Sequence, residues 1–303
     1  MVNISEDQIH AIGTILNNES KPLKERFRAL FTLRNIGGPL AIKHISQCFN
    51  DPSALLKHEL AYCLGQMQDE NANDILISVL ENEKQEPMVR HEAAEALGAI
   101  ASDTAIFYLQ KYKNDRVTEV AETCELALDR INWLKSTKTE NNALSESAYN
   151  SVDPAPPAAS KDINDLKAIL IDEKINLFNR YRAMFALRNI GSEDAIKALG
   201  EALKCGSALF KHEVAFVLGQ MQHKSSFPYL KDSLEDTAEN EMVRHECAEA
   251  LGSIAVDECK DLLEKYVNDN KRVVRESCII ALDMCEYENS PEFQYANTLH
   301  TLS

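Results

Sequence analysis

The sequence lacks the features of several large classes of protein. No apolar run approaches the roughly 18–20 residues of a membrane span, and the first residues lack the basic and apolar regions of a secretory signal. Positive charge is scarce, because 32 Lys and Arg face 48 Asp and Glu and leave a formal net charge of −16. A duplex-binding groove needs clustered positive charge. We therefore expect neither a membrane segment nor direct contact with nucleic acid.

Cysteine chemistry also finds little support. The eight cysteines contain no C-x-x-C pair and are typical of buried, reduced thiols in a cytosolic protein. The chain has no glycine-rich phosphate loop and no G-x-S-x-G motif, which leaves ATP hydrolysis and serine-ester chemistry unsupported. The acidic surplus would attract a cationic ligand or a basic protein surface, or serves only solubility.

The chain contains an internal duplication. Three segments of the first half return in the second half at the same offset of 154 residues, without a gap. The identities are 9 of 12 for residues 26–37 and 180–191, 11 of 15 for 54–68 and 208–222, and 12 of 14 for 88–101 and 242–255.

Each half has a shorter period as well. Leu64-Gly65 and Leu97-Gly98 are 33 residues apart, and their copies keep that spacing. Each unit indicates two amphipathic helices, with Ser207 near the start of one second helix, where its hydroxyl would cap the first turn. Such a unit cannot bury its apolar face alone and must stack on its neighbours. The fold class is therefore all-α, an α-solenoid of eight HEAT-like helical-hairpin repeats in two pseudo-two-fold-related halves.

The pattern also predicts the domain organisation. We expect four repeats over residues 1–134 and four over residues 161–287. Residues 135–160 include the proline-rich stretch 153–157, show no apolar periodicity and are typical of a flexible linker. Residues 288–303 are expected to form a loose tail.

Four His-Glu dipeptides stand at corresponding points of the second helices in the middle repeats of the two halves: His58-Glu59, His91-Glu92, His212-Glu213 and His245-Glu246. Within a half the two pairs are one repeat apart, so they project from adjacent parallel helices about 8–10 Å apart and can converge on one ion. Two imidazoles and one carboxylate leave coordination positions open, as in non-haem iron oxygenases, although zinc would accept the same ligands. If the halves face one another, the two sites form a dinuclear centre.

One His-Glu pair on a helix is usually a solvated surface feature, and duplication copies any feature. The recurrence within one half, where the flanking residues differ, favours metal ligation. Glu95 and Glu249 lie one turn after His91 and His245. Further metal ligation or acceptance of a hydrogen bond beside the ligands is open to them, and we expect them to be carboxylates of the helix surface. The repeated Arg-Asn dipeptides at 34–35 and 188–189 precede a glycine and are interpreted as ordinary helix ends.

With the four pairs, the 33-residue period and the linker in place, the chain resembles the deoxyhypusine hydroxylase family, the HEAT-repeat di-iron monooxygenases of eukaryotes. The resemblance covers residues 4–285 and rests on L-K-H-E-L-A and M-V-R-H-E-A-A-E-A-L-G, each with its partner copy. It implies an oxidoreductase that hydroxylates the deoxyhypusine side chain of translation initiation factor 5A and so forms hypusine. It also implies two Fe(II) ions per chain, dioxygen as co-substrate, and a cytoplasmic monomer.

The resemblance assigns a role to each pair. One iron would be held by His58, His91 and Glu92, and the other by His212, His245 and Glu246. Glu59 and Glu213 would be the catalytic and substrate-binding residues, facing the pocket and holding the cationic amines. This split comes from the resemblance, because residues i and i+1 are about 100° apart on a helix and the helix argument allows either glutamate.

Two other functions stay open from the residues alone. A solenoid of this type is most often a protein-binding scaffold, in which case the pairs would line a partner groove. A hydrolase with a dinuclear zinc or manganese centre is the second alternative. Stoichiometric iron argues against the scaffold, and dioxygen consumption during turnover argues against the hydrolase.

Overall fold

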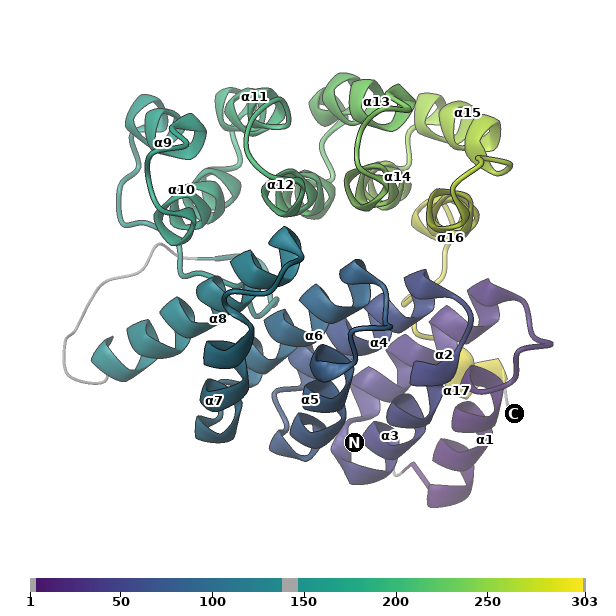
Figure 1. Cartoon of the computed structure of the whole chain (residues 1–303). Helices are drawn as coiled ribbons and strands as arrows, with labels where there is room; N and C mark the ends of the chain where they lie inside the picture. The colour runs from purple at the N-terminus through teal and green to yellow at the C-terminus, as the bar shows by residue number, and fades with distance from the viewer. Residues whose placement is uncertain (1–3, 138–146, 302–303) are drawn as a thin grey trace. The chain divides into compact units, whose positions relative to one another are not determined.

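The computed structural model describes residues 4–137 and 147–301, and within these ranges every regular element is a helix (Figure 1). The all-α prediction is confirmed. No helix in the described ranges is both long enough and apolar enough for a membrane span. The chain divides into two compact units: unit 1 consists of Met1–Leu128 with Pro291–Ser303, and unit 2 of Asp129–Ser290.

Unit 1 contains four helical hairpins. Their first helices are α1 (Glu6–Leu16), α3 (Gly38–Ser46), α5 (Asn73–Glu81) and α7 (Asp103–Tyr112). Their second helices are α2 (Leu23–Ile36), α4 (Ala54–Met67), α6 (Pro87–Ile100) and α8 (Thr118–Thr137), the last of which continues into unit 2. The short 3-10 helices η1 (Gln47–Asn50) and η2 (Glu70–Ala72) and the C-terminal α17 (Thr298–Thr301) complete this unit.

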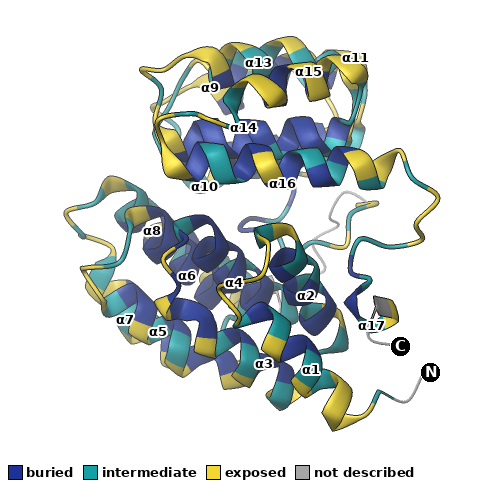
Figure 2. Cartoon of the chain, turned by 90° about the vertical axis from the view of Figure 1, so that its right-hand side faces the viewer, coloured by how far each residue is buried: buried dark blue, intermediate teal, exposed yellow. Residues whose placement is uncertain are grey.

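Unit 2 repeats the pattern. Its first helices are α9 (Ile163–Ile171), α11 (Glu193–Ala202), α13 (Phe227–Glu235) and α15 (Asp257–Tyr266). Its second helices are α10 (Leu177–Ile190), α12 (Ala208–Met221), α14 (Glu241–Ile254) and α16 (Arg272–Glu288), with η3 (Lys224–Ser226) before α13. The two sets form two rows in Figure 1, and exposed residues concentrate on the row of first helices in Figure 2. The eight hairpins are the eight repeats that the sequence predicts.

The second helices begin where the sequence indicates. Ser207 has extended backbone geometry at the N-cap of α12, and its hydroxyl accepts the backbone N–H of Phe210 at 3.3 Å. Ser53 does the same for Leu56 at the start of α4, at 3.1 Å. Each hydroxyl satisfies one of the N–H groups that have no partner within the helix. The register of both helices, and so the direction of their histidines, is fixed at this end.

The Leu-Gly period has a packing origin. A Cβ added to Gly65 in α4 would lie 2.7 Å from the Cα of Ala96 in α6, and one added to Gly219 in α12 would lie 2.9 Å from the Cα of Ala250 in α14. Real Cβ atoms do not approach other atoms so closely, so only glycine permits this separation of neighbouring second helices. These contacts join the helices that carry the His-Glu pairs.

Four buried arginines share a set of contacts that recurs from repeat to repeat and that we do not predict from the sequence: Arg26, Arg90, Arg180 and Arg244. Each donates its Nε–H to the backbone carbonyl ten residues earlier, at 2.8–2.9 Å, near the end of the preceding first helix. Three of them also pair with an aspartate twenty-five residues later, as Arg244 does with Asp269 at 2.7 Å. A buried guanidinium needs these acceptors, because an unpaired buried charge is strongly destabilising.

The segment expected to be a flexible linker makes defined contacts in the described part of its course. Asp153 pairs with Arg188 of α10 at 2.6 Å, and the backbone N–H of Ala158 donates to the carbonyl of Arg182 at 2.8 Å. Residues 138–146 of the same expected linker lie outside the described residues. The physical reason for the order at 147–158 is the buried Arg188, which takes its carboxylate from this segment.

The tail expected to be loose also makes specific contacts, all within unit 1. Arg28 of α2 pairs with Glu292 at 2.9 Å, and its guanidinium lies 4.5 Å from the ring centroid of Tyr295. The backbone N–H of Thr298 donates to the hydroxyl of Thr32 at 3.3 Å. Residues 291–301 therefore pack against α2 rather than extend freely from the last repeat.

Candidate metal centre

Unit 1 brings its two His-Glu pairs together. His58 lies on α4 and His91 on α6, both are buried, and their ring centroids are 5.5 Å apart. The Gly65–Ala96 contact sets the spacing of these two helices. Adjacent second helices therefore place two imidazoles side by side, as the 33-residue period predicts.

Glu92 completes a group of three donors with these imidazoles. One ligand atom from each of His58, His91 and Glu92 lies within 4.8 Å of the others. The Nε2 of His58 is 3.2 Å from an Oε of Glu92, whereas its Nδ1 is 3.3 Å from an Oε of Glu59 on the same helix. Two imidazoles and a carboxylate suit a divalent transition metal and leave room for further ligands.

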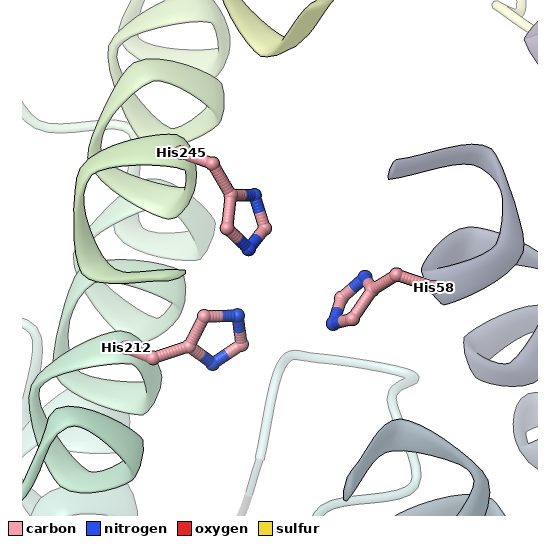
Figure 3. A group of neighbouring side chains, drawn as sticks. All are labelled: His58, His212 and His245. Carbon is pink, nitrogen blue, oxygen red and sulfur yellow. The ribbon is translucent and has the colours of Figure 1, made fainter. Parts of the chain in front are cut away.

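Unit 2 repeats the geometry. His212 on α12 and His245 on α14 project from neighbouring helices (Figure 3), and their ring centroids are 5.2 Å apart. The Nε2 of His212 lies 3.3 Å from an Oε of Glu246, which corresponds to the His58–Glu92 contact of unit 1. Glu213 is buried on α12. Each unit therefore assembles its own histidine and glutamate cluster.

The carboxylates make the unit 1 cluster favourable for positive charge. Burial by itself would lower the pKa of His58, but Glu92 and Glu59 outweigh it through their charges and hydrogen bonds, and the pKa lies well above the ordinary 6.5. The surrounding carboxylates therefore favour a proton on His58. A bound metal cation would take the place of that proton among the same carboxylates.

Glu249 is not the exposed helix-surface carboxylate that we expect from the sequence. Its side chain is only 15% exposed, an Oε lies 3.5 Å from the Nδ1 of His245, and another contact is the hydroxyl of Ser277 on α16, which donates to it at 3.0 Å. Carboxylates next to ligating histidines fix the orientation of the imidazole ring. The i, i+4 spacing of His245 and Glu249 is the sequence pattern that indicates their contact. No sequence pattern indicates the contact of Ser277 with Glu249.

Tyr62 lies one turn after His58 on α4. Burial first, and then the charge of Glu59, raise the pKa of Tyr62 well above 10, while the guanidinium of Arg34 on α2 acts in the opposite direction. Arg34 thus belongs to the surroundings of this cluster. Phe216 stands at the corresponding point of unit 2, so the phenol is particular to unit 1.

The cysteines behave as expected. All eight are free thiols, and seven are buried. Burial raises the pKa of Cys124 to about 12, which keeps it protonated at neutral pH. A thiolate nucleophile therefore gains no support.

Comparison with known proteins places this architecture in a family. The family model for HEAT repeats matches residues 42–129 and 196–283. The protein named deoxyhypusine hydroxylase of Drosophila pseudoobscura pseudoobscura is 62% identical over 302 residues, which cover 99% of this chain and 98% of that protein. The chain belongs to the deoxyhypusine hydroxylase family. This confirms the resemblance found in the sequence.

Two further relatives agree with this assignment. The deoxyhypusine hydroxylase of Drosophila melanogaster is 61% identical over 300 residues, covering 99% of this chain and 98% of that protein. The solved structure of human deoxyhypusine hydroxylase in complex with glycerol is 57% identical, with a TM-score of 0.90, and covers 93% of this chain and 97% of that one. The helical-hairpin architecture is thus shared with an experimental structure of the family.

Proposed function

We propose that this protein is a di-iron, dioxygen-dependent monooxygenase that hydroxylates the deoxyhypusine side chain of translation initiation factor 5A to form hypusine. Membership of the deoxyhypusine hydroxylase family supports the reaction class. The cluster of His58, His91 and Glu92, with donor atoms within 4.8 Å of one another, is the single observation that carries the metal chemistry.

The proposed ligands fit iron by the chemistry of their donors. Two imidazoles and one carboxylate per unit suit Fe(II) and leave positions open, and no thiolate is among them. His58, His91 and Glu92 would hold one ion, and His212, His245 and Glu246 the other. When bound, iron supplies the redox chemistry that activates dioxygen for attack on an unactivated C–H bond, which side chains cannot provide. That both ions form one dinuclear centre stays a prediction from the sequence.

Glu59 and Glu213 have a separate role in this proposal. Both are buried, with 8% and 3% of their surface exposed, and each precedes the metal-binding pair of the next repeat. A buried carboxylate beside the cluster lowers the free energy of an ammonium group in the site and orients the chain that carries it. The substrate arm carries such amines, so these glutamates would place its reacting carbon.

The proposal also covers the partner, the oligomeric state and the cellular location of the protein. The partner would be the deoxyhypusine form of translation initiation factor 5A, without direct contact with nucleic acid. The chain would act as a monomer in the cytoplasm, where its free thiols stay reduced.

The test uses the full chain reconstituted with ferrous ion without oxygen, then supplied with isotopically labelled dioxygen, a reductant and the deoxyhypusine form of factor 5A. Hydroxylation adds one oxygen atom to a C–H bond while the second leaves as water with two electrons from the reductant. We expect the labelled atom in the product side chain and dioxygen consumed in step with turnover. Turnover with oxygen from water would favour the dinuclear hydrolase. Binding without turnover or iron uptake would favour the scaffold.

A further inference from the structure

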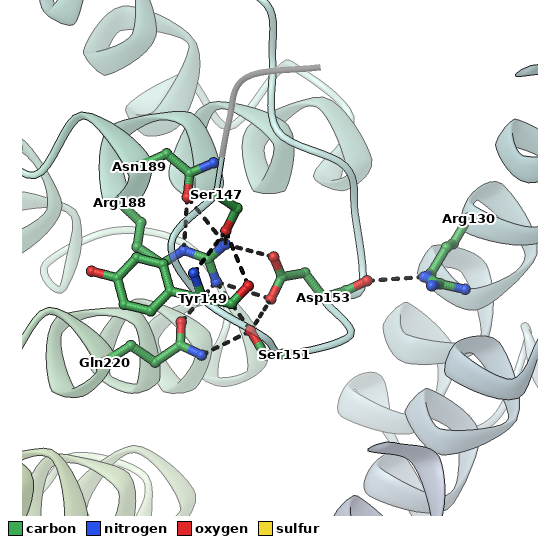
Figure 4. A network of polar contacts seen from close by, with 8 residues as sticks. All are labelled: Arg130, Ser147, Tyr149, Ser151, Asp153, Arg188, Asn189 and Gln220. Carbon is green, nitrogen blue, oxygen red and sulfur yellow. Dashed lines mark hydrogen bonds and ion pairs between the residues drawn. The ribbon is translucent and has the colours of Figure 1, made fainter. Parts of the chain in front are cut away.

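Arg188 of α10 lies at the centre of a polar network in unit 2 (Figure 4). Its side chain is fully buried and makes two hydrogen bonds to the carboxylate of Asp153, at 2.9 and 2.6 Å. The side-chain oxygen of Gln220 on α12 accepts a third at 2.8 Å, and the ring centroid of Tyr149 lies 4.5 Å from the guanidinium. Fork-shaped pairing of this kind is the strongest form of carboxylate recognition available to a side chain.

The occupant of this network is an extended peptide segment. Gln220 also donates to the hydroxyl of Ser151 at 3.0 Å, and further along the chain Ala158 donates its backbone N–H to the carbonyl of Arg182. The segment thus follows the surface of α10 with its aspartate over Arg188. We call Arg188, Asn189 and Gln220 the unit 2 carboxylate seat.

The same three residue types recur in unit 1, 154 residues earlier: Arg34, Asn35 and Gln66. Arg34 donates to the side-chain oxygen of Asn35 at 3.3 and 3.2 Å, as Arg188 does to that of Asn189 at 3.2 Å twice. Its guanidinium lies over Phe31 at 5.5 Å, as that of Arg188 lies over the equivalent phenylalanine at 4.8 Å.

The two copies differ in what occupies them. Within residues 4–137 and 147–301, Arg34 has no carboxylate partner and is part-exposed. The tail reaches α2 through Arg28, Phe31 and Thr32. In the described part of the chain, the side-chain hydrogen bonds of Arg34 go to Asn35. The unit 1 seat therefore keeps the arginine that donates to an aspartate in unit 2, and this arginine has no carboxylate partner in the described chain.

We infer that Arg34, with Asn35 and Gln66, is a docking position for an acidic side chain on an extended segment of the protein substrate. We expect the docked segment to resemble the one that contacts Arg188, an extended peptide that contributes a carboxylate. The position of Arg34 suits the docking of substrate, because its charge acts on Tyr62, which lies one turn after His58. In a chain of net charge −16, a guanidinium beside the cluster gives an acidic side chain one favourable position and so fixes the register of the substrate. This inference rests on the proposed function.

The test compares Arg34→Gln with the wild-type holoenzyme, and Lys24→Gln serves as the matched control. Lys24 is an exposed cation on the same helix, so its loss changes the net charge equally. We expect Arg34→Gln to weaken binding of the deoxyhypusine form of factor 5A about tenfold, with iron content and saturated turnover kept, and Arg34→Lys to lie between. Binding of the unmodified lysine form should weaken by the same factor, because the contact is remote from the reacting side chain.

A double-mutant cycle identifies the partner residue. Acidic residues of factor 5A are neutralised one at a time, and one of them should show no further loss when combined with Arg34→Gln. Unchanged affinity in Arg34→Gln overturns the inference, as does a loss equal to that of Lys24→Gln. A fall in saturated turnover at unchanged affinity overturns it too. If wild type binds factor 5A through Arg34 but does not hydroxylate it, the proposed function fails and the docking position stands.

Discussion

Gly65 of α4 and Ala96 of α6 pack so closely that a Cβ added to the glycine would lie 2.7 Å from the Cα of the alanine. His58 and His91 stand on the same two helices, and their rings are 5.5 Å apart. The glycine therefore sets the distance between two proposed metal ligands. The repeated Leu-Gly dipeptide links the packing of the solenoid to the geometry of its metal cluster.

We expect Gly65→Ala to separate α4 from α6, because the new methyl group must displace backbone. The free energy of unfolding should fall by about 1–3 kcal/mol, and the affinity of unit 1 for ferrous ion by about tenfold. Anaerobic ferrous titration together with urea unfolding measures both effects.

Gly98→Ala is the matched control. Its Cβ would lie 2.6 Å from the Cβ of Ala127, in the equivalent contact between α6 and α8. Stability should fall to a similar extent, but iron affinity should change less, because α8 carries no proposed ligand. Equal loss of iron affinity in both variants would show that the glycines act only through general stability.

The sequence predicts the repeats, the helix starts and the clustering of the His-Glu pairs, since all three follow from short periods. The aspartates that pair with Arg26, Arg90 and Arg244 carry a usable signal as well, a constant separation of twenty-five residues. The pairing of Arg188 with Asp153 could not be predicted in this way. It depends on where a segment without periodicity packs, and the Arg-Asn dipeptide at 188–189 has the sequence pattern of an ordinary helix end.

Glu59→Gln and Glu213→Gln should keep iron and lose turnover. Each removes the negative charge that would hold a substrate amine, so we expect turnover to fall by about 100-fold. Glu92→Gln and Glu246→Gln are the matched comparison, because they remove a proposed ligand and should lose iron from their own unit. Metal analysis beside the turnover assay separates the two roles. Loss of iron in proportion to activity in the first pair would reverse the assignment.

Cys205→Asp should stabilise unit 2. Arg180 is the one of the four repeated arginines with a cysteine at the twenty-fifth position after it, and its Nη2 has no hydrogen-bond partner among the described residues. An aspartate there would complete the pattern and raise the free energy of unfolding by about 1 kcal/mol. Cys205→Asn controls for size without charge. A stabilisation by Asn equal to that by Asp would argue against the ion pair.

Asp115 should make a pH-dependent contribution to stability. Burial alone would raise the pKa of its carboxyl, but hydrogen bonds from Arg90 and from the backbone N–H of Val117 outweigh it and hold the pKa below the usual 3.8. Because the folded pKa is the lower one, the contribution is complete above the unfolded pKa and is lost as the pH falls through the folded pKa.

Asp115→Asn should therefore lower the free energy of unfolding by about 3 kcal/mol at neutral pH. The difference from wild type should stay constant down to about pH 5 and shrink below about pH 4. Urea unfolding across this range measures it. A difference that grows towards acid pH would contradict the assigned pairing.

Iron stoichiometry tests the central claim most directly, namely that each unit holds one iron through two histidines and a glutamate. Anaerobic titration with ferrous ion should give two irons per chain in wild type. His91→Ala and His245→Ala should each bind one, and the double variant none, with helix content unchanged. Two irons retained in either single variant, or none in wild type, would contradict the account.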